Sequence, residues 1–167
     1  MTYLFDTNSL IESKKKFYAF DIAPGFWKQL ESIMASRDVR IPEIVVEEIS
    51  RQSDDLKDWI EGIQYVKEAT KNPEHIQNYS KVMNYISSCG YYNERAVSSW
   101  AQRELADPWL VAEAMSLGAT IVSFERPNHD LGKGSKQGKV HIPDVAIHFG
   151  VQICSLYDFM REFGIKL

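Results

Sequence analysis

Short apolar runs alternate with amphipathic stretches along the whole chain. Residues 3–5 (YLF) are apolar and aromatic and end at a polar cluster, which predicts a short buried strand. Comparable runs predict strands at residues 39–41, 119–124 and 151–154, and the run at 119–124 is nearly continuous, as in strands buried on both faces of a parallel sheet. Because helical stretches separate these runs, the pattern predicts an α/β domain with a central parallel sheet.

Apolar residues recur at helical spacing between the predicted strands. They predict helices at residues 26–36, 42–49, 107–117, 141–149 and 155–163. The segment 54–104 adds two apolar stripes, at residues 56–66 and 76–86, and a third predicted helix at residues 94–105. We interpret the stripes as core, and the segment as a helical insertion or bundle within a single domain of residues 1–167.

Composition narrows the class of protein. The chain has 167 residues, of which 44% are hydrophobic and 25% charged, as in an ordinary globular domain. A formal net charge of −4 argues against a protein that coats nucleic acid through bulk charge, but it leaves room for a local basic groove. Cys89 and Cys154 form no CxxC pair and show no metal spacing, which favours free thiols. Because no signal-like segment and no apolar run of ~18 residues is found, we expect a cytoplasmic protein without membrane contact.

Several acidic residues stand where a parallel sheet places its ligand site. Ligands of such sheets bind beyond the carboxyl ends of the strands. Asp6 directly follows the first predicted strand, and Glu125 follows the run at residues 119–124. Asp107 begins the helix that leads into that run, and Glu47 and Glu48 lie on the helix after the second strand. We therefore expect these carboxylates to gather at one edge of the sheet.

Each acid also has a purely structural explanation. The cluster Asp6-Thr7-Asn8-Ser9 is typical of an Asx turn or helix cap. Asp107 before Pro108 suits an N-cap position. Glu47 and Glu48 fit a solvated helix face, and Glu125 fits a surface loop. The sequence leaves both explanations open for each residue taken singly.

Taken together, the motifs resemble a known family. The stretches YLFDTNSLI, IPEIVVEEIS and ADPWLVAEAMSLGATIVSFE, followed by a terminal strand and helix, are similar in order and spacing to PIN-domain nucleases, and most similar to a branch that opens with Tyr-Leu-Phe-Asp-Thr-Asn. The resemblance covers nearly the whole chain and is weakest at residues 54–104. It implies a three-layer α/β/α sandwich with a central parallel sheet and extra helices in the middle of the chain.

The resemblance also assigns functional residues one by one. Asp6 matches the first acid of the family, and Asn8 matches the polar partner two positions later. Glu48 falls on the second acid, with Glu47 as the alternative. Asp107 matches the acid that opens the A-x-x-x-G helix.

The fourth acid departs from the family pattern. Ser123-Phe124-Glu125 stands where the family has T-x-D, so Ser123 replaces Thr and Glu125 replaces Asp. The longer side chain leaves open whether Glu125 binds metal directly. The implied cofactor is Mg²⁺ or Mn²⁺, which prefer hard oxygen ligands. The implied reaction is hydrolysis of an RNA phosphodiester that leaves a 5′ phosphate.

A glycine- and lysine-rich loop follows the fourth acid. Arg126, Lys133, Lys136 and Lys139 are candidates for contacts to RNA phosphates, which would not read the base sequence. The alternative is a solvated surface loop. The run Lys14–Lys16 is a candidate for a second basic edge, although a solvated face is the simpler interpretation.

These observations favour a divalent-metal-dependent endoribonuclease, and the resemblance suggests the toxin of a toxin–antitoxin pair. Its expected partners are RNA, a cognate antitoxin protein and a second copy in a homodimer. A PIN-fold scaffold that binds RNA or protein without cutting stays open, because the T-x-D motif is altered. A haloacid-dehalogenase-type phosphatase fits poorly, because Asn8 stands where that chemistry requires a second Asp.

Overall fold

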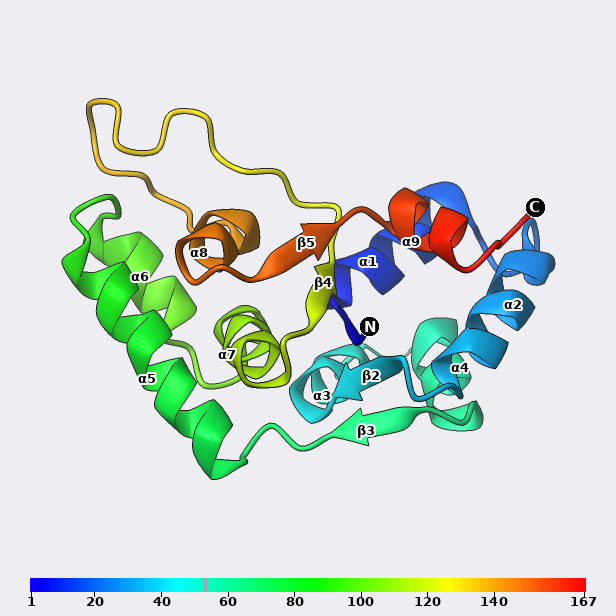
Figure 1. Ribbon diagram of the computed structural model, residues 1–167. Coiled ribbons are helices and arrows are strands. Elements are labelled where there is room, and N and C mark those ends of the chain that lie inside the picture. The colour runs from blue at the N-terminus through cyan, green and yellow to red at the C-terminus, as the bar shows by residue number, and fades with distance from the viewer. Residues whose placement is uncertain (53) are drawn as a thin grey trace.

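The central feature of the computed structural model, which describes residues 1–52 and 54–167, is a five-stranded parallel sheet. Its strands are Tyr3–Phe5 (β1), Val39–Pro42 (β2), Val66–Glu68 (β3), Thr120–Val122 (β4) and Gln152–Cys154 (β5). They lie in the order β3-β2-β1-β4-β5. Helices flank the sheet on both sides (Figure 1), so the predicted α/β/α sandwich with a central parallel sheet is confirmed.

The helices divide into two layers. One side of the sheet carries Pro73–Ser88 (α5), Glu94–Trp100 (α6), Asp107–Leu117 (α7) and Ile142–His148 (α8) (Figure 1). The other side carries Thr7–Glu12 (α1), Pro24–Met34 (α2), Asp55–Gly62 (α4) and Leu156–Glu162 (α9). Glu43–Ser50 (α3) follows β2, and the π-helical turn Ser13–Phe17 (η1) continues α1. Among the described residues, no helix has both the length and the apolar character that crossing a membrane requires.

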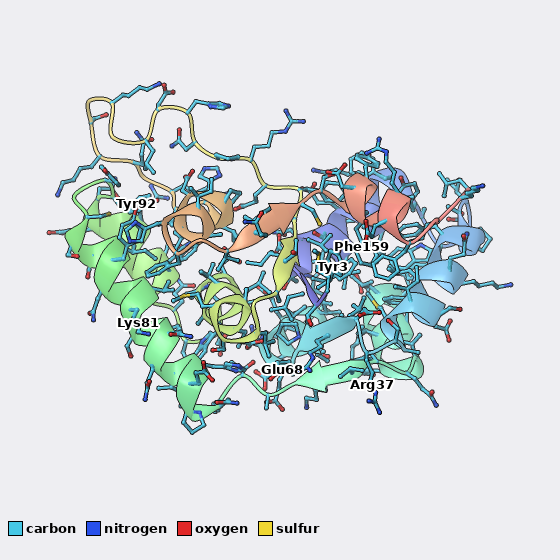
Figure 2. The ribbon with its side chains drawn as sticks, viewed as in Figure 1. Tyr3, Arg37, Glu68, Lys81, Tyr92 and Phe159 are labelled. Atoms are coloured by element: carbon cyan, nitrogen blue, oxygen red, sulfur yellow. The ribbon has the colours of Figure 1, made fainter. Side chains whose placement is uncertain are left out.

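Strand β1 lies at the centre of the sheet and is buried on both faces. Leu4 packs into the core under α5 to α8, whereas Tyr3 and Phe5 pack into the core on the other side. The ring of Phe159 on α9 meets the ring of Tyr3 edge-on, with 5.3 Å between centroids (Figure 2). A strand with apolar neighbours on both faces has no place for a polar residue, which explains the unbroken run at residues 3–5.

The predicted helical character of residues 54–104 is wrong in part. Val66 was the last member of an expected helical stripe, but α4 ends at Gly62 and Val66 lies in β3, paired with Arg40 of β2. A short edge strand with one neighbour and polar residues lacks the apolar run by which inner strands are identified. The third helix also ends earlier than expected, at Trp100, because an exposed turn follows it.

Candidate active site

The sheet topology brings the first and fourth acids to its centre. Asp6 follows β1 and Glu125 follows β4, and these strands are neighbours. Chain order reverses between them, and such a switch point is where open α/β sheets bind ligands. Asp107 lies in the first turn of α7, the helix that leads into β4, and Glu48 lies on α3 after β2.

Asp6 acts both as a helix cap and as the most buried of the four acids, with 1% of its surface exposed. Its Oδ1 accepts a hydrogen bond from the backbone N–H of Asn8 at 3.2 Å, and its Oδ2 accepts one from the Ser123 hydroxyl at 2.9 Å. The pKa of Asp6 is raised to about 7, mainly by burial and in addition by the charges of Glu125 and Glu48, against the effect of both hydrogen bonds. The turn at Asp6-Thr7-Asn8-Ser9 and the candidate active site are therefore the same feature.

Asp107 does not serve as the N-cap that its position before Pro108 suggested. Ala106 occupies the N-cap position, and Asp107 lies one residue inside the helix. Its pKa is raised well above the usual value, first by burial and then by the charges of Asp6, Glu125 and Glu48. The structure therefore brings the four predicted acids into one electrostatically coupled group.

The structure separates Glu48 from Glu47. Thr7 donates a hydrogen bond from its hydroxyl to Glu48 Oε2 at 2.6 Å, which directs this carboxylate toward the end of β1. Burial raises the pKa of Glu48, while Thr7 and Arg51 oppose the shift. Glu47 is exposed and lines a separate pocket of about 410 Å³ beside Arg51. Sequence reasoning missed that Thr7 orients Glu48, although the position of Thr7 between Asp6 and Asn8 pointed to a place in the site.

Both carboxylate oxygens of Glu125 have partners. Its Oε2 accepts a hydrogen bond from the backbone N–H of Ile142 at 2.8 Å, at the start of α8. Its Oε1 pairs with Lys139 Nζ at 3.1 Å. The Ser123 hydroxyl accepts the N–H of Glu125 at 3.1 Å while donating to Asp6, so Ser123 links the ends of β4 and β1.

The loop between β4 and α8 places only two of the four basic residues predicted to bind RNA close to the acids. Arg126 and Lys139 line a pocket of about 610 Å³ together with Asn8, Glu125 and residues of the same loop. Lys133 and Lys136 are exposed, but they do not line this pocket. The tip of the loop arches away from the sheet toward α6 (Figure 1), where the backbone N–H of Gln137 donates to the carbonyl of Tyr91 at 2.8 Å.

A further acid, Asp144, was not predicted to belong to the site. It is 8% exposed, lies in the first turn of α8 and adds to the negative surroundings of Glu125. Its Oδ1 accepts a hydrogen bond from the N–H of Asn128 at 2.8 Å, while its Oδ2 has no hydrogen-bond partner among the described residues. Burial raises its pKa. Sequence reasoning did not select Asp144, because an acid after a proline is also typical of an ordinary helix start.

Comparison with known proteins places the chain in a family. Residues 3–167 match the family described as "Domain of unknown function (DUF4411)". The chain belongs to the DUF4411 family. The DUF4411 chain also resembles a solved structure, VapBC2 from Rickettsia felis bound to a DNA fragment from their promoter, with a TM-score of 0.55 and 12% sequence identity over 93% of this chain and 98% of that one. At this identity the likeness shows a shared fold and nothing about activity. No curated protein matches the sequence.

The donor atoms of the DUF4411 site are of the kind that hard divalent cations prefer. All four predicted acids offer carboxylate oxygens, which suit Mg²⁺ and Mn²⁺. Within residues 1–52 and 54–167, no three acidic, histidine or cysteine side chains converge closely enough to hold one ion by themselves. Mg²⁺ commonly keeps several waters and uses only one or two protein carboxylates, so a hydrated ion would need no more than two of these side chains.

Proposed function

We propose that this DUF4411 protein is a divalent-metal-dependent endoribonuclease. One observation carries the proposal: Asp6, Asp107, Glu48 and Glu125 gather at the switch point of a parallel sheet, where the charges of Glu48 and Glu125 help to raise the pKa values of Asp6 and Asp107. Carboxylates buried together are stable only when protons or cations compensate their charge. The fold shared with VapBC2 supports the proposal at the level of architecture.

The residues around the acids have separate roles in this proposal. Asp6 and Asp107 would hold the cation, and Thr7 would orient Glu48 beside it. A bound Mg²⁺ or Mn²⁺ would supply an activated water and stabilise charge on the scissile phosphate. Arg126 and Lys139 line the adjoining pocket and would bind phosphates of the substrate.

We also propose that a protein partner covers this site, as expected for the toxin of a toxin–antitoxin pair, and that the chain forms a homodimer. The support is the fold-level likeness to VapBC2, whose structure includes a promoter DNA fragment. A neighbouring gene for a small DNA-binding protein that co-purifies with this chain and blocks its cleavage of RNA would support the pairing. Co-purification without inhibition would argue against it.

A scaffold that binds RNA without cutting is the second candidate function. The observation in its favour is the fourth acid, because Glu125 is already paired with Lys139 and with the N–H of Ile142. A carboxylate occupied in this way is less available to a cation. Cleavage of RNA would favour the nuclease, and binding without cleavage would favour the scaffold.

The deciding experiment is a cleavage assay on a 5′-labelled single-stranded RNA. We expect purified protein to cut the RNA internally with Mg²⁺ or Mn²⁺ and to stop when EDTA is added. A DNA strand of the same sequence tests the preference for RNA. Binding of the RNA without cleavage at any metal concentration would favour the scaffold.

Glu48 and Glu47 provide a matched pair of variants. We expect Glu48→Gln to slow cleavage by about 10- to 100-fold, because Glu48 is directed toward the other acids by Thr7. Glu47→Gln is the same chemical change on the next residue, which faces a different pocket, and it should leave the rate unchanged. Equal losses in both variants would show that general charge, and not the site, controls the rate.

A further inference from the structure

Three aromatic side chains from distant parts of the sequence meet next to the acids. Phe17 ends the π-helical turn η1, Phe124 follows β4, and Tyr157 lies in the first turn of α9. The ring centroids are 5.3 Å apart for Phe17 and Phe124, 6.4 Å for Phe17 and Tyr157, and 6.1 Å for Phe124 and Tyr157. We call these three residues the aromatic cluster.

Two of the three rings in the aromatic cluster are open to solvent, and the third, Phe124, is half-buried and packs against the core on that side of the sheet. Phe17 is 44% exposed and Tyr157 is 40% exposed, and neither belongs to the two cores that stabilise the sheet. Large apolar side chains that stay in water together, instead of joining a core, commonly mark a binding surface. Stability alone therefore does not explain the cluster.

Chain connectivity joins the aromatic cluster to the acids. Phe124 stands between Ser123, which binds Asp6, and Glu125. Phe124 also lines the pocket of about 610 Å³ that Asn8 and Glu125 border. A ligand that extends from the acids along this pocket would meet the ring of Phe124, which contacts the other two rings of the cluster.

Two exposed cations lie close in sequence to members of the aromatic cluster. Arg126 follows Phe124 by two residues, is exposed and lines the same pocket as Lys139. Lys15 is exposed two residues before Phe17, whereas Lys14 pairs with Asp54 and Asp55 and Lys16 pairs with Glu12. Aromatic faces flanked by cations suit a polyanion that carries flat, unpaired rings, as single-stranded nucleic acid does.

We propose that Phe17, Phe124 and Tyr157 form a stacking platform for unpaired bases of a single-stranded RNA, next to the cleavage site. That the ligand is RNA rests on the proposed function. Stacking uses the face of any base, so the platform selects unpaired strands over duplexes without reading sequence. Arg126 then holds the phosphate that leads from the stacked base toward the acids, and Lys139 joins it when that phosphate replaces Glu125 as its partner.

Fluorescence anisotropy with a 5′-labelled single-stranded RNA, in EDTA to prevent cleavage, tests the platform. Wild-type protein should bind the single strand more tightly than a duplex of the same sequence. The double variant Phe17→Ala/Tyr157→Ala should weaken single-strand binding by about 10-fold or more, while Phe17→Tyr/Tyr157→Phe should keep it. An oligonucleotide with abasic positions should bind the wild type and the double alanine variant equally.

Further measurements separate stacking from charge and from misfolding. The double alanine variant should keep the slope of log affinity against log salt, because the phosphate contacts persist, whereas Arg126→Ala should reduce that slope. Ile76→Ala on α5 removes a side chain of similar exposure, 45%, and should bind like wild type. Thermal unfolding must confirm that each variant folds, and a misfolded double variant is replaced by the single variant Tyr157→Ala with the same expectation.

Two results would overturn the platform. One is unchanged single-strand affinity in a folded alanine variant. The other is a loss of self-association, or of binding to a protein partner, with RNA affinity intact, which would make the cluster a protein interface. The outcome is independent of the cleavage assay. If the protein cleaves RNA but the cluster variants bind RNA normally, only the platform is rejected. If RNA binding depends on the cluster but the protein never cleaves RNA, only the nuclease is rejected.

Discussion

Replacing Asp6 by Asn should abolish cleavage and, at the same time, stabilise the fold above neutral pH. The variant keeps the size of the side chain but removes the charge that we expect to hold the cation. Loss of a metal-binding carboxylate should reduce the cleavage rate by about 100-fold or more. Mg²⁺ should also raise the unfolding temperature of wild type but not of Asp6→Asn, because only wild type gains stability by binding the ion.

The expected gain in stability follows from the raised pKa. Burial raises the pKa of Asp6 from 3.8 to about 7, so the folded state binds a proton that the unfolded state has released. The stability that this proton contributes is complete below about pH 4 and is lost as the pH rises through 7. At about pH 8 the wild type carries a buried charge, and the neutral Asn variant should be more stable by on the order of 2 kcal/mol, after the loss of one hydrogen bond.

Urea unfolding in EDTA at about pH 5 and pH 8 measures this gain. Asp21→Asn, an exposed change of the same type, should leave the stability nearly unchanged at both pH values. A variant that is less stable than wild type at pH 8 would show that Asp6 is mainly a structural cap. Full cleavage activity in Asp6→Asn would remove the acid from the site altogether.

The positions of three of the four candidate acids were predictable because each of the three lies beside a strong local signal. Asp6 and Glu125 follow apolar runs that end abruptly, and Asp107 precedes a proline that starts a helix. In a parallel sheet, the ends of strands and the starts of the helices that lead into strands meet at one edge. The sequence therefore locates acids along the chain, and topology brings them together.

The contacts that set the role of each acid depend on residues far apart in sequence. The hydrogen bond from Thr7 to Glu48 spans 41 residues, and the contact between Ile142 N–H and Glu125 spans 17. Neither is encoded in a local pattern. The edge strand β3 was missed for a related reason, since its pairing with β2 and not its own apolar content makes it a strand.

A second buried acid, away from the candidate site, should control how stability depends on pH. Glu113 lies on α7 with none of its surface exposed, and its two carboxylate oxygens have no hydrogen-bond partner among the described residues. Its pKa is raised to about 8, mainly by burial. The charges of Glu68, on edge strand β3 (Figure 2), and of Glu43 contribute to the rise, and the Thr70 hydroxyl opposes it. Glu113 is therefore protonated in the folded state at neutral pH.

Glu113→Gln should make the protein less sensitive to alkaline pH. The pKa of Glu113 is higher in the folded state than its ordinary value of 4.5, so its contribution to stability is complete below about pH 4.5 and is lost as the pH rises through 8. Glutamine has nearly the same shape and cannot ionise. The variant should resemble wild type at about pH 5 and exceed its free energy of unfolding by on the order of 3 kcal/mol at about pH 9.

The difference in unfolding free energy between variant and wild type, measured by urea unfolding from about pH 5 to pH 9, isolates Glu113. Asp6 and Asp107 also have raised pKa values, but both are present in each protein and their contributions cancel in the difference. Glu31→Gln makes the same change at an exposed position on α2 and should give a difference that does not vary with pH. A flat difference for Glu113→Gln would mean that this carboxylate is already ionised in the folded protein at neutral pH, with a cation or water compensating its charge in the core.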